Sequence, residues 1–289
     1  MSQFSYDVAA TYRIYPKMSK NPPPIFQDDK FKLAELCFQS FKDSLRGLRV
    51  KLWVLLNDCP PAYEAMFTRI WGPDHIVLLR YPGVAAGTTL HEASRILREQ
   101  TDAEIVYFAD DDYVYLRDQF KLGVDFLKQN LDADFVAYYD HLDLHTTDLH
   151  NLPSEARDLG GKTWYSRGST THTFLATRAA LIETHTLFSR LHKAFYGQVS
   201  PDLAMWMALT KKRVFNPVKF FSWVFTHPFW TASIFYAWFY CWRQILFGRR
   251  FTLWIPRPSL ATHMEARALA PGIDWQKEFR EQQSRIPEA

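Results

Sequence analysis

Three consecutive aspartates, Asp110 to Asp112, stand between aromatic and apolar flanks in the stretch YFADDDYVYL at residues 107–116. Adjacent carboxylates repel one another, so such a run needs a cation, a solvated turn or a ligand that donates hydrogen bonds. In an extended segment Asp110 and Asp112 point the same way. Carboxylate oxygens suit Mg²⁺ or Mn²⁺, and a diphosphate can supply further ligands. The alternative is an acidic turn whose aspartates cap the next helix.

The elements around the aspartates alternate between strand and helix from residue 6 to about residue 140. We expect strands at 6–14, 50–56, 75–79, 104–109 and 134–139, and helices at 32–45, 61–71, 88–100 and 119–130. This alternation predicts a doubly wound α/β fold with a largely parallel sheet. Further along the chain we expect a polar loop or lid at 141–170, a strand at 171–177, and helices at about 178–191 and at 200–209, the last capped by Ser200.

The strand ends define a candidate site. Open α/β sheets bind ligands at the carboxyl ends of their parallel strands. The three aspartates end the fourth expected strand, and Asn57 and Asp58 end the second. Both groups should therefore lie at the same edge of the sheet.

In this position the aspartates resemble the DxD motif of GT-A glycosyltransferases, especially the family-2-like group. The resemblance covers roughly residues 6–265 and is strongest over the first half. It implies a GT-A (Rossmann-like) fold, a nucleotide diphosphate sugar as donor and Mn²⁺ or Mg²⁺ as cofactor. It gives Asp110 the ribose side with a share in the metal, Asp112 the metal, and Asp111 a supporting role.

The resemblance also implies nucleotide contacts from the ends of the first two strands, namely from Thr11, Arg13, Asn57 and Asp58. On the helix before the motif, Arg95 and Arg98 either approach the phosphates or are simply solvated. Since no composition or spacing requires these roles, they depend on the resemblance alone.

Two later residues complete the implied site. Asp202, in SPDLAMW, stands where inverting members place the base that removes the acceptor proton. The chain departs from the Glu-Asp pair common in that family, because Pro201 precedes the aspartate. The alternative is an ordinary first-turn aspartate on the helix dipole. His263, in SLATHMEARAL, matches the C-terminal histidine that closes the metal site in many GT-A enzymes, and imidazole suits Mn²⁺ better than Mg²⁺.

Other motifs and the composition exclude several classes. The net charge of +3, from 34 Lys+Arg against 31 Asp+Glu, argues against bulk nucleic-acid binding. The three cysteines show no disulfide or zinc spacing, and the N-terminus does not resemble a signal peptide, so we expect a cytoplasmic protein. The stretch GGKT (160–163) lacks the first glycine of a phosphate-binding loop, and no acyl-enzyme motif occurs. The His- and Asp-rich stretch 140–150 leaves open a dinuclear hydrolase site, although a polar lid over an acceptor pocket is the preferred interpretation.

An aromatic block occupies residues 220–242. Its 23 residues include 12 aromatic ones and no Asp, Glu, Lys or Arg, and basic residues flank both ends. Trp and Tyr favour the membrane interface, and one crossing would separate Asp112 from His263. We therefore expect a helical segment that lies in the membrane interface, with a buried helix pair or an oligomer contact as the alternative.

The sequence thus predicts a catalytic domain at 1–215, a membrane-interface segment at 216–250 and a C-terminal segment at 251–289 that returns to the active site. We expect transfer of a sugar, with UDP favoured by family habit, to a saccharide or lipid-linked acceptor at the inner face of the cell membrane. The residues expected to stack on the acceptor are Trp164, Tyr165 and Trp206. A sugar-phosphate nucleotidyltransferase and a non-catalytic membrane protein with a degenerate transferase fold remain the alternatives.

Overall fold

A computed structural model describes residues 4–19, 21–147, 150, 152–193, 201–212, 214 and 224–285. Within these residues the main sheet has nine strands in the order β3-β2-β1-β4-β9-β6-β10-β8-β7. Its strands are β1 (Val8–Ile14), β2 (Val50–Asn57), β3 (Ile76–Tyr81), β4 (Ile105–Asp110), β6 (Phe135–Val136), β7 (Ala156–Leu159), β8 (Lys162–Ser166), β9 (Phe174–Thr177) and β10 (Leu253–Arg257). Beside it, β5 (Tyr113–Tyr115) pairs antiparallel with β11 (Ala261–His263).

The sheet is mixed and mostly parallel, which confirms the predicted α/β fold class. Strands β3, β2, β1 and β4 are parallel neighbours. Strand β9 is antiparallel to both β4 and β6, and β10 is parallel to β6. The carboxyl ends of β1, β2 and β4 therefore meet at one edge, as the candidate site requires.

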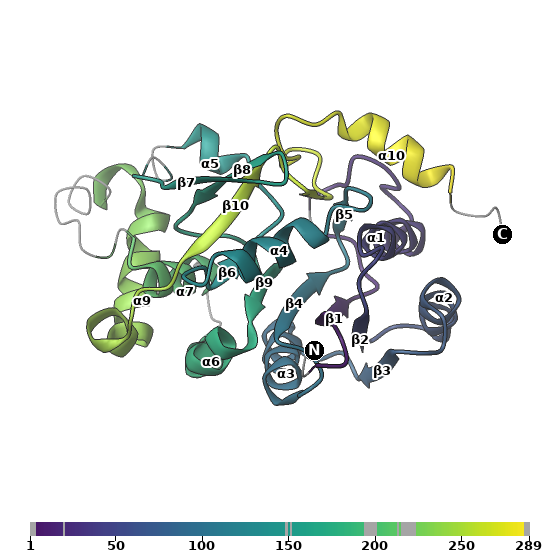
Figure 1. Ribbon diagram of the computed structural model, residues 1–289, viewed down its shortest axis with the longest axis horizontal. Helices are drawn as coiled ribbons and strands as arrows, with labels where there is room; N and C mark the ends of the chain where they lie inside the picture. The colour runs from purple at the N-terminus through teal and green to yellow at the C-terminus, as the bar shows by residue number, and fades with distance from the viewer. Residues whose placement is uncertain are drawn as a thin grey trace.

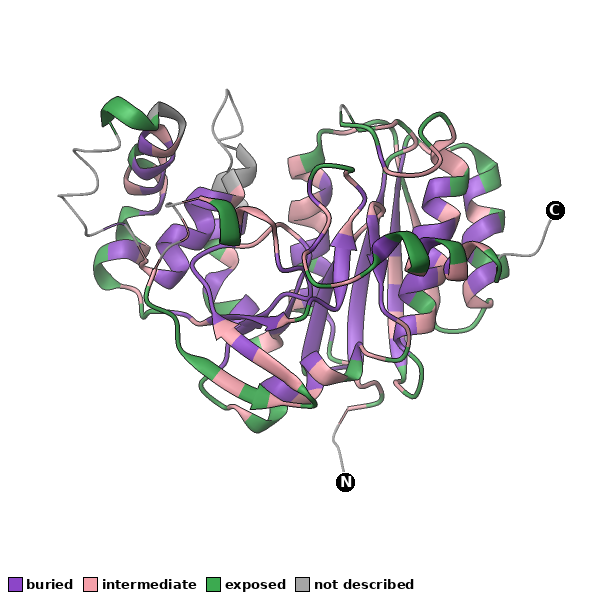
Figure 2. Cartoon of the chain, turned by 90° about the horizontal axis from the view of Figure 1, so that it is seen from above, coloured by how far each residue is buried: buried purple, intermediate pink, exposed green. Residues whose placement is uncertain are grey.

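Helices cover both faces of the sheet (Figure 1). They are α1 (Lys30–Ser44), α2 (Pro61–Trp71), α3 (Ala86–Glu99), α4 (Lys121–Gln129), α5 (Asp143–Thr146), α6 (Arg178–Lys193), α7 (Pro201–Thr210), α9 (Pro228–Phe247) and α10 (Trp275–Gln283). One apolar core joins the sheet to α1, α2, α4 and α10, and a second joins it to α3, α6, α7 and α9. In Figure 2 the central strands are largely buried between these layers, as a sheet with helices on both faces should be.

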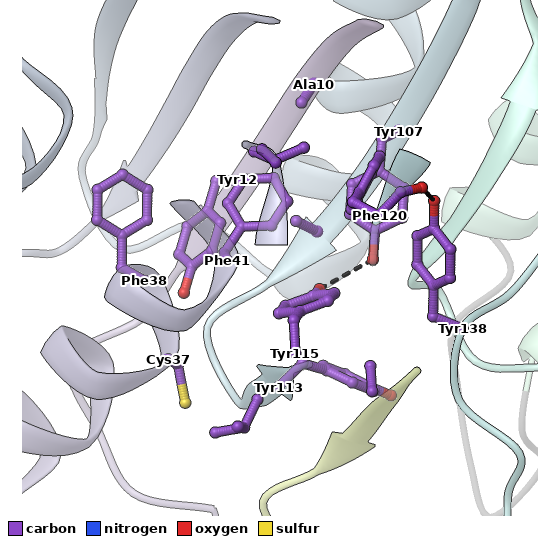
Figure 3. Packing of buried hydrophobic residues seen from close by; sticks show 14 of the residues in the cluster. Ala10, Tyr12, Cys37, Phe38, Phe41, Tyr107, Tyr113, Tyr115, Phe120 and Tyr138 are labelled. Carbon is purple, nitrogen blue, oxygen red and sulfur yellow. Dashed lines mark hydrogen bonds between the residues drawn. The ribbon is translucent and has the colours of Figure 1, made fainter. Parts of the chain in front are cut away.

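Aromatic packing fixes the turn that carries the aspartates (Figure 3). Tyr107 of β4 stacks on Phe41 of α1, with ring centroids 5.8 Å apart. Its hydroxyl also hydrogen-bonds that of Tyr115 in β5, at 2.9 Å. The strands before and after the aspartates are thus joined to each other and to α1 by buried side chains, which limits movement of the turn.

The expected polar loop at 141–170 is wrong over much of its length, because it contains α5 and a β-hairpin. Strands β7 and β8 pair from Leu159↔Lys162 outward and extend the main sheet. Gly160 and Gly161 form the turn with φ of 62° and 72°, a conformation that favours glycine. The GGKT stretch is therefore a hairpin turn.

The aromatic block forms most of helix α9, which packs against α7. Residues 220–223 of the block, and the expected cap Ser200, lie outside the described residues. Among the helices that the structure describes, none has the length and apolarity needed to cross a membrane.

Candidate functional site

Asp110 is bound by Arg13 from the neighbouring strand. The two residues are partners in the β1–β4 register, so their side chains emerge side by side. Arg13 Nε donates to Asp110 Oδ1 at 2.7 Å, and Nη2 donates to Oδ2 at 2.8 Å. Both side chains are largely buried, and a bidentate pair of this kind is among the stronger protein hydrogen bonds. Arg13 thereby fixes the position of Asp110 and balances its charge.

Asp111 pairs with Lys30 at the start of α1. Lys30 Nζ lies 2.8 Å from Asp111 Oδ2, and the Tyr15 amide donates to the same oxygen at 3.2 Å. Burial is the largest influence on Asp111 and raises its pKa to about 6, although Lys30 acts to lower it. Sequence reasoning missed Lys30, because a lysine at a helix start carries no signal of a distant partner.

Asp112 meets His263, which is 151 residues away along the chain. Strand β11 places His263 opposite Tyr113 of β5, and His263 Nε2 lies 3.0 Å from Asp112 Oδ2. Burial alone would raise the pKa of Asp112, but the His263 imidazole holds it below its usual range. In turn, burial lowers the pKa of His263 and Asp112 raises it, with a net rise. The contact that the resemblance implied between these two residues is therefore present.

The donor chemistry at Asp112 and His263 fits a divalent ion. Carboxylate and imidazole are both usual ligands of divalent metals, and the two side chains are held together by the hydrogen bond between them. Mg²⁺ in phosphate sites is commonly bound by one or two carboxylates, the remaining ligands coming from phosphate and water. Asp110 does not join this pair, since Arg13 binds both of its oxygens. Correspondingly, no group of three His, Cys, Asp or Glu side chains suited to a metal occurs among the described residues.

A cleft of about 380 Å³ opens beside Asp110, within the range typical of ligand sites. We call it the β1/β4 cleft, and it is lined by Arg13, Ile14, Tyr15, Asn57, Val84, Ala85, Ala86, Thr89, Asp110 and Asp111. Asn57 is used to build its wall: the side-chain amide donates to the Val84 carbonyl and accepts from the Val84 amide, both at 2.8 Å. The cleft thus brings together Arg13, Asn57, Asp110 and Asp111, four of the predicted nucleotide-contacting residues.

Two other residues predicted to contact the nucleotide lie elsewhere. Thr11 is fully buried in β1 and does not line the β1/β4 cleft, because its side chain is covered within the sheet. Asp58 lies beyond β2 with a positive φ of 59° and lines a separate cleft with Cys59 and Arg80. On α3, Arg95 forms ion pairs with glutamates of its own helix, which supports the solvated alternative.

The acceptor-stacking expectation is wrong for the two tryptophans. Trp164 is fully buried, stacks on Phe126 and donates to the Leu159 carbonyl. Trp206 is also fully buried and packs edge-on against Phe135. Neither ring has a free face for a sugar. Tyr165 is partly exposed, and its ring lies beneath the guanidinium groups of Arg167 and Arg257.

A second cleft of about 290 Å³ lies at the start of α7. This α7 cleft is lined by His141, Asp143, Leu144, His150, Ser169, Thr170, Thr171, Asp202, Leu203 and Trp230. Asp202 Oδ1 accepts the Leu203 amide at 2.9 Å, which is an ordinary first-turn contact and leaves Oδ2 for a ligand.

The segment 169–173 lies between the two clefts. Thr173 Oγ1 donates to Asp110 Oδ2 at 3.4 Å, and Tyr113 Oη donates to Thr171 Oγ1 at 2.9 Å. Between these threonines, His172 has a pKa lowered chiefly by burial and raised in part by the charges of Asp202 and Asp110. The charges of a carboxylate from each cleft therefore act on this imidazole. The sequence predicts no site residue here, because it places residues 169–170 in the polar loop and 171–173 in the strand that follows.

The stretch 140–150 does not form a metal site in its described part. Asp140 is buried and pairs with His145 Nε2 at 2.8 Å and with Arg257 Nε at 3.0 Å. A carboxylate held by a guanidinium is poorly suited to bind a metal, and Asp148 lies outside the described residues. The described geometry therefore gives the hydrolase alternative no support.

Comparisons with known proteins show distant similarity of fold. No family model and no curated protein matches the chain. Similar solved structures include galactosyltransferase LgtC in complex with donor and acceptor sugar analogues, at 12% identity over 97% of both chains and a TM-score of 0.47. Another is 4-diphosphocytidyl-2C-methyl-D-erythritol synthase from Anaerococcus prevotii DSM 20548, at 6% identity over 72% of this chain and 84% of the other, with a TM-score of 0.42.

A third is a putative nucleotide-diphospho-sugar transferase from Desulfovibrio desulfuricans G20, at 14% identity over 45% of this chain and 56% of the other, with a TM-score of 0.33. By name these structural neighbours are a galactosyltransferase, a synthase and a putative nucleotide-diphospho-sugar transferase. At such identities and TM-scores the similarity carries no argument about activity. The functional argument therefore depends on the geometry of the chain itself.

Proposed function

We propose that the chain transfers a sugar from a nucleotide diphosphate sugar, UDP-linked by preference, to a hydroxyl of a saccharide or lipid-linked acceptor. The observation that carries the proposal is the pair of clefts on either side of segment 169–173. One is lined by Asp110 and Asp111, and the other by Asp202. A donor and an acceptor bound in them would meet at this segment.

The β1/β4 cleft is the proposed donor site. Arg13 holds Asp110 in position to accept hydrogen bonds from the ribose hydroxyls, and Asn57 shapes the wall against the base. Asp112 and His263 would hold Mn²⁺ or Mg²⁺. When bound, the ion would offset the negative charge that develops on the leaving diphosphate. Lys30, paired with Asp111, keeps that buried carboxylate in place beside the cleft.

The α7 cleft is the proposed acceptor site. Asp202 would accept the proton of the acceptor hydroxyl as that oxygen attacks the anomeric carbon, and this role implies inversion at the anomeric centre. Asp202 Oδ1 is oriented by the Leu203 amide, which leaves Oδ2 to take the proton. His172, between the clefts, would help to exclude water from the reacting groups.

Calorimetric titration tests the donor site. Purified protein is titrated with UDP, GDP and dTDP, each with and without Mn²⁺. We expect metal-dependent binding of one nucleotide, which Asp112→Ala abolishes and the surface control Asp125→Ala retains. Absence of nucleotide binding under every condition would favour the non-catalytic alternative.

Product analysis separates the two kinds of transferase. With a donor nucleotide sugar, a glycosyltransferase releases a nucleoside diphosphate, whereas a nucleotidyltransferase works with a nucleoside triphosphate and releases inorganic diphosphate. We expect the first product, together with a large loss of transfer but unchanged nucleotide binding in Asp202→Asn. An unimpaired transfer rate in that variant would remove Asp202 as the base.

We further propose that the protein works in the cytoplasm, peripherally bound at the inner face of the cell membrane. The support is the aromatic composition of α9 and the basic residues around it.

A further inference from the structure

Helix α9 presents an apolar face to solvent opposite the face that packs on the protein. The apolar residues exposed on this face are Phe235 (60% exposed), Phe239 (75%), Trp242 (42%) and Leu246 (50%), and exposed Phe247 (79%) ends the helix. The spacing of the first four, by four, three and four residues, places them in one line along the helix. We call this line the α9 stripe. The opposite face, which includes Ile234, Ala237, Cys241 and Ile245, is buried in the core shared with α7.

The chain around the stripe is basic and free of acidic residues. Between Asp202 and Glu265 there is no Asp or Glu, whereas eight Lys and Arg occur in that interval. Two of them, Arg243 and Arg250, are exposed near the C-terminal end of the stripe. Arg243 lies over the Trp242 ring at 5.3 Å, so an aromatic and a cationic group share one patch. Arg249 is instead occupied by Asp134 and Glu183.

We propose that the α9 stripe docks α9 flat on an anionic phospholipid bilayer, and that the α7 cleft therefore takes a lipid-linked acceptor. The inference rests on the proposed function of the α7 cleft. Aromatic side chains beside arginines, on a helix with no acidic residue, suit the headgroup region of an anionic membrane. A neutral protein partner would not require this excess of positive charge.

The position of Trp230 sets the distance between the α7 cleft and the membrane. Trp230 lines the α7 cleft and belongs to α9. It lies four and seven residues before Ile234 and Ala237, so it is on the protein-facing side of the helix, opposite the α9 stripe. The cleft is then about one helix diameter, roughly 10 Å, from the plane of the stripe. An acceptor hydroxyl in the headgroup of a membrane lipid reaches that height, whereas a hydroxyl within the acyl region does not.

Vesicle flotation tests the docking. The full chain is floated with vesicles of phosphatidylcholine alone and with vesicles of phosphatidylcholine that also contain phosphatidylglycerol, an anionic lipid that attracts basic residues. We expect binding to the anionic vesicles only, weakened by salt. The double variant F235S/F239S should lower binding about tenfold or more, since it removes two rings from the interface. The variant R243Q/R250Q should lower it for anionic vesicles.

Leu131→Ser is the matched control, because Leu131 is 94% exposed and lies between α4 and β6 rather than on α9. It should bind vesicles like the unmodified protein. All changed side chains are exposed, so thermal unfolding should be nearly unchanged and reports any variant that fails to fold. Equal flotation of F235S/F239S and Leu131→Ser, or no flotation of the unmodified protein, would overturn the docking. A dimer that F235S/F239S converts to a monomer would assign the stripe to a second copy of the chain.

The nucleotide titration keeps this inference distinct from the proposed function. F235S/F239S should bind the nucleotide as tightly as the unmodified protein. If the docking is right, it should also keep its transfer rate toward a soluble acceptor saccharide and lose rate only toward an acceptor carried in vesicles. A parallel loss of both transfer rates in F235S/F239S would contradict the membrane role. Absence of nucleotide binding in the unmodified protein would contradict the proposed function but not the docking.

Discussion

Asn57 offers a sharp test of how the wall of the β1/β4 cleft is made. Its side chain is buried at the end of β2, where it donates to the Val84 carbonyl and accepts from the Val84 amide. These two bonds fasten the loop before α3, from which Val84, Ala85 and Ala86 line the cleft. Asn57→Asp preserves the shape of the side chain but removes its donor. The Val84 carbonyl then loses its partner and faces a carboxylate.

The expected cost follows from those contacts. One buried acceptor is left without its hydrogen bond, which costs about 1–3 kcal/mol of the free energy of unfolding. The new carboxylate is buried beside a carbonyl oxygen, so its pKa in the folded state should rise above that in the unfolded chain. The folded state then binds a proton more readily, and the variant recovers stability as the pH falls. The deficit should therefore be larger at pH 8 than at pH 5.

Urea denaturation of the variant and the unmodified protein at both pH values measures the difference. Asn21→Asp is the matched control, because Asn21 is exposed, and it should change stability by less than about 0.5 kcal/mol. Nucleotide titration follows on the same samples. If Asn57→Asp is as stable as the unmodified protein at pH 8, the two bonds of Asn57 do not hold the loop at Val84 in place. Unchanged stability with lost nucleotide affinity would instead make Asn57 a direct nucleotide contact, as the family resemblance implied.

Three further changes test the packing and the assigned contacts. Gly123→Ala places a methyl group 2.5 Å from the hydroxyl oxygen of buried Tyr138, so the free energy of unfolding should fall by about 1–3 kcal/mol in chemical denaturation; unchanged stability would show that Tyr138 can move aside. Burial raises the pKa of Cys59 to about 12, so little of its reactive thiolate is present at pH 8. Mass spectrometry at that pH should show alkylation of Cys59 at least about a hundredfold slower than that of free cysteine. An equal rate would contradict the burial of this thiol. Asp140→Asn weakens the pairing with Arg257 and should lower the thermal midpoint through a loss of about 1.5–3 kcal/mol, whereas an unchanged midpoint would leave Asp140 available for another role.

Periodicity predicted the first half of the fold because most elements there bury an apolar face, although β3 has no fully buried residue. The helix expected at 61–71 agrees with α2 at both ends, and Pro61 occupies the first turn, where proline is tolerated. The strands at the edge of the sheet were harder to predict. In the hairpin of β7 and β8, charged and polar side chains outnumber apolar ones, and Trp164 is the fully buried anchor. A polar edge strand and a polar loop have similar compositions, so composition does not separate them.

The partners of the three aspartates could not be predicted from periodicity. The aspartates are adjacent in sequence, but Arg13 comes from β1, Lys30 from the start of α1 and His263 from β11. Sequence pattern does not fix which residues of two strands stand opposite, and a slip of one residue turns the side chains to the other face. Only the family resemblance supplied His263, and nothing supplied Lys30.

The three pairs also explain how the chain tolerates three adjacent carboxylates in a mostly buried turn. Each carboxylate has its own basic partner, and the three partners approach from different elements, so repulsion within the turn is offset by attraction across it. Asp110 and Asp111 are committed to residues with no metal-binding capacity, Arg13 and Lys30. Asp112 alone is paired with a side chain that can itself bind a metal. The asymmetry among the partners, rather than the run of aspartates, is what makes Asp112 the residue in which to test the proposed metal role first.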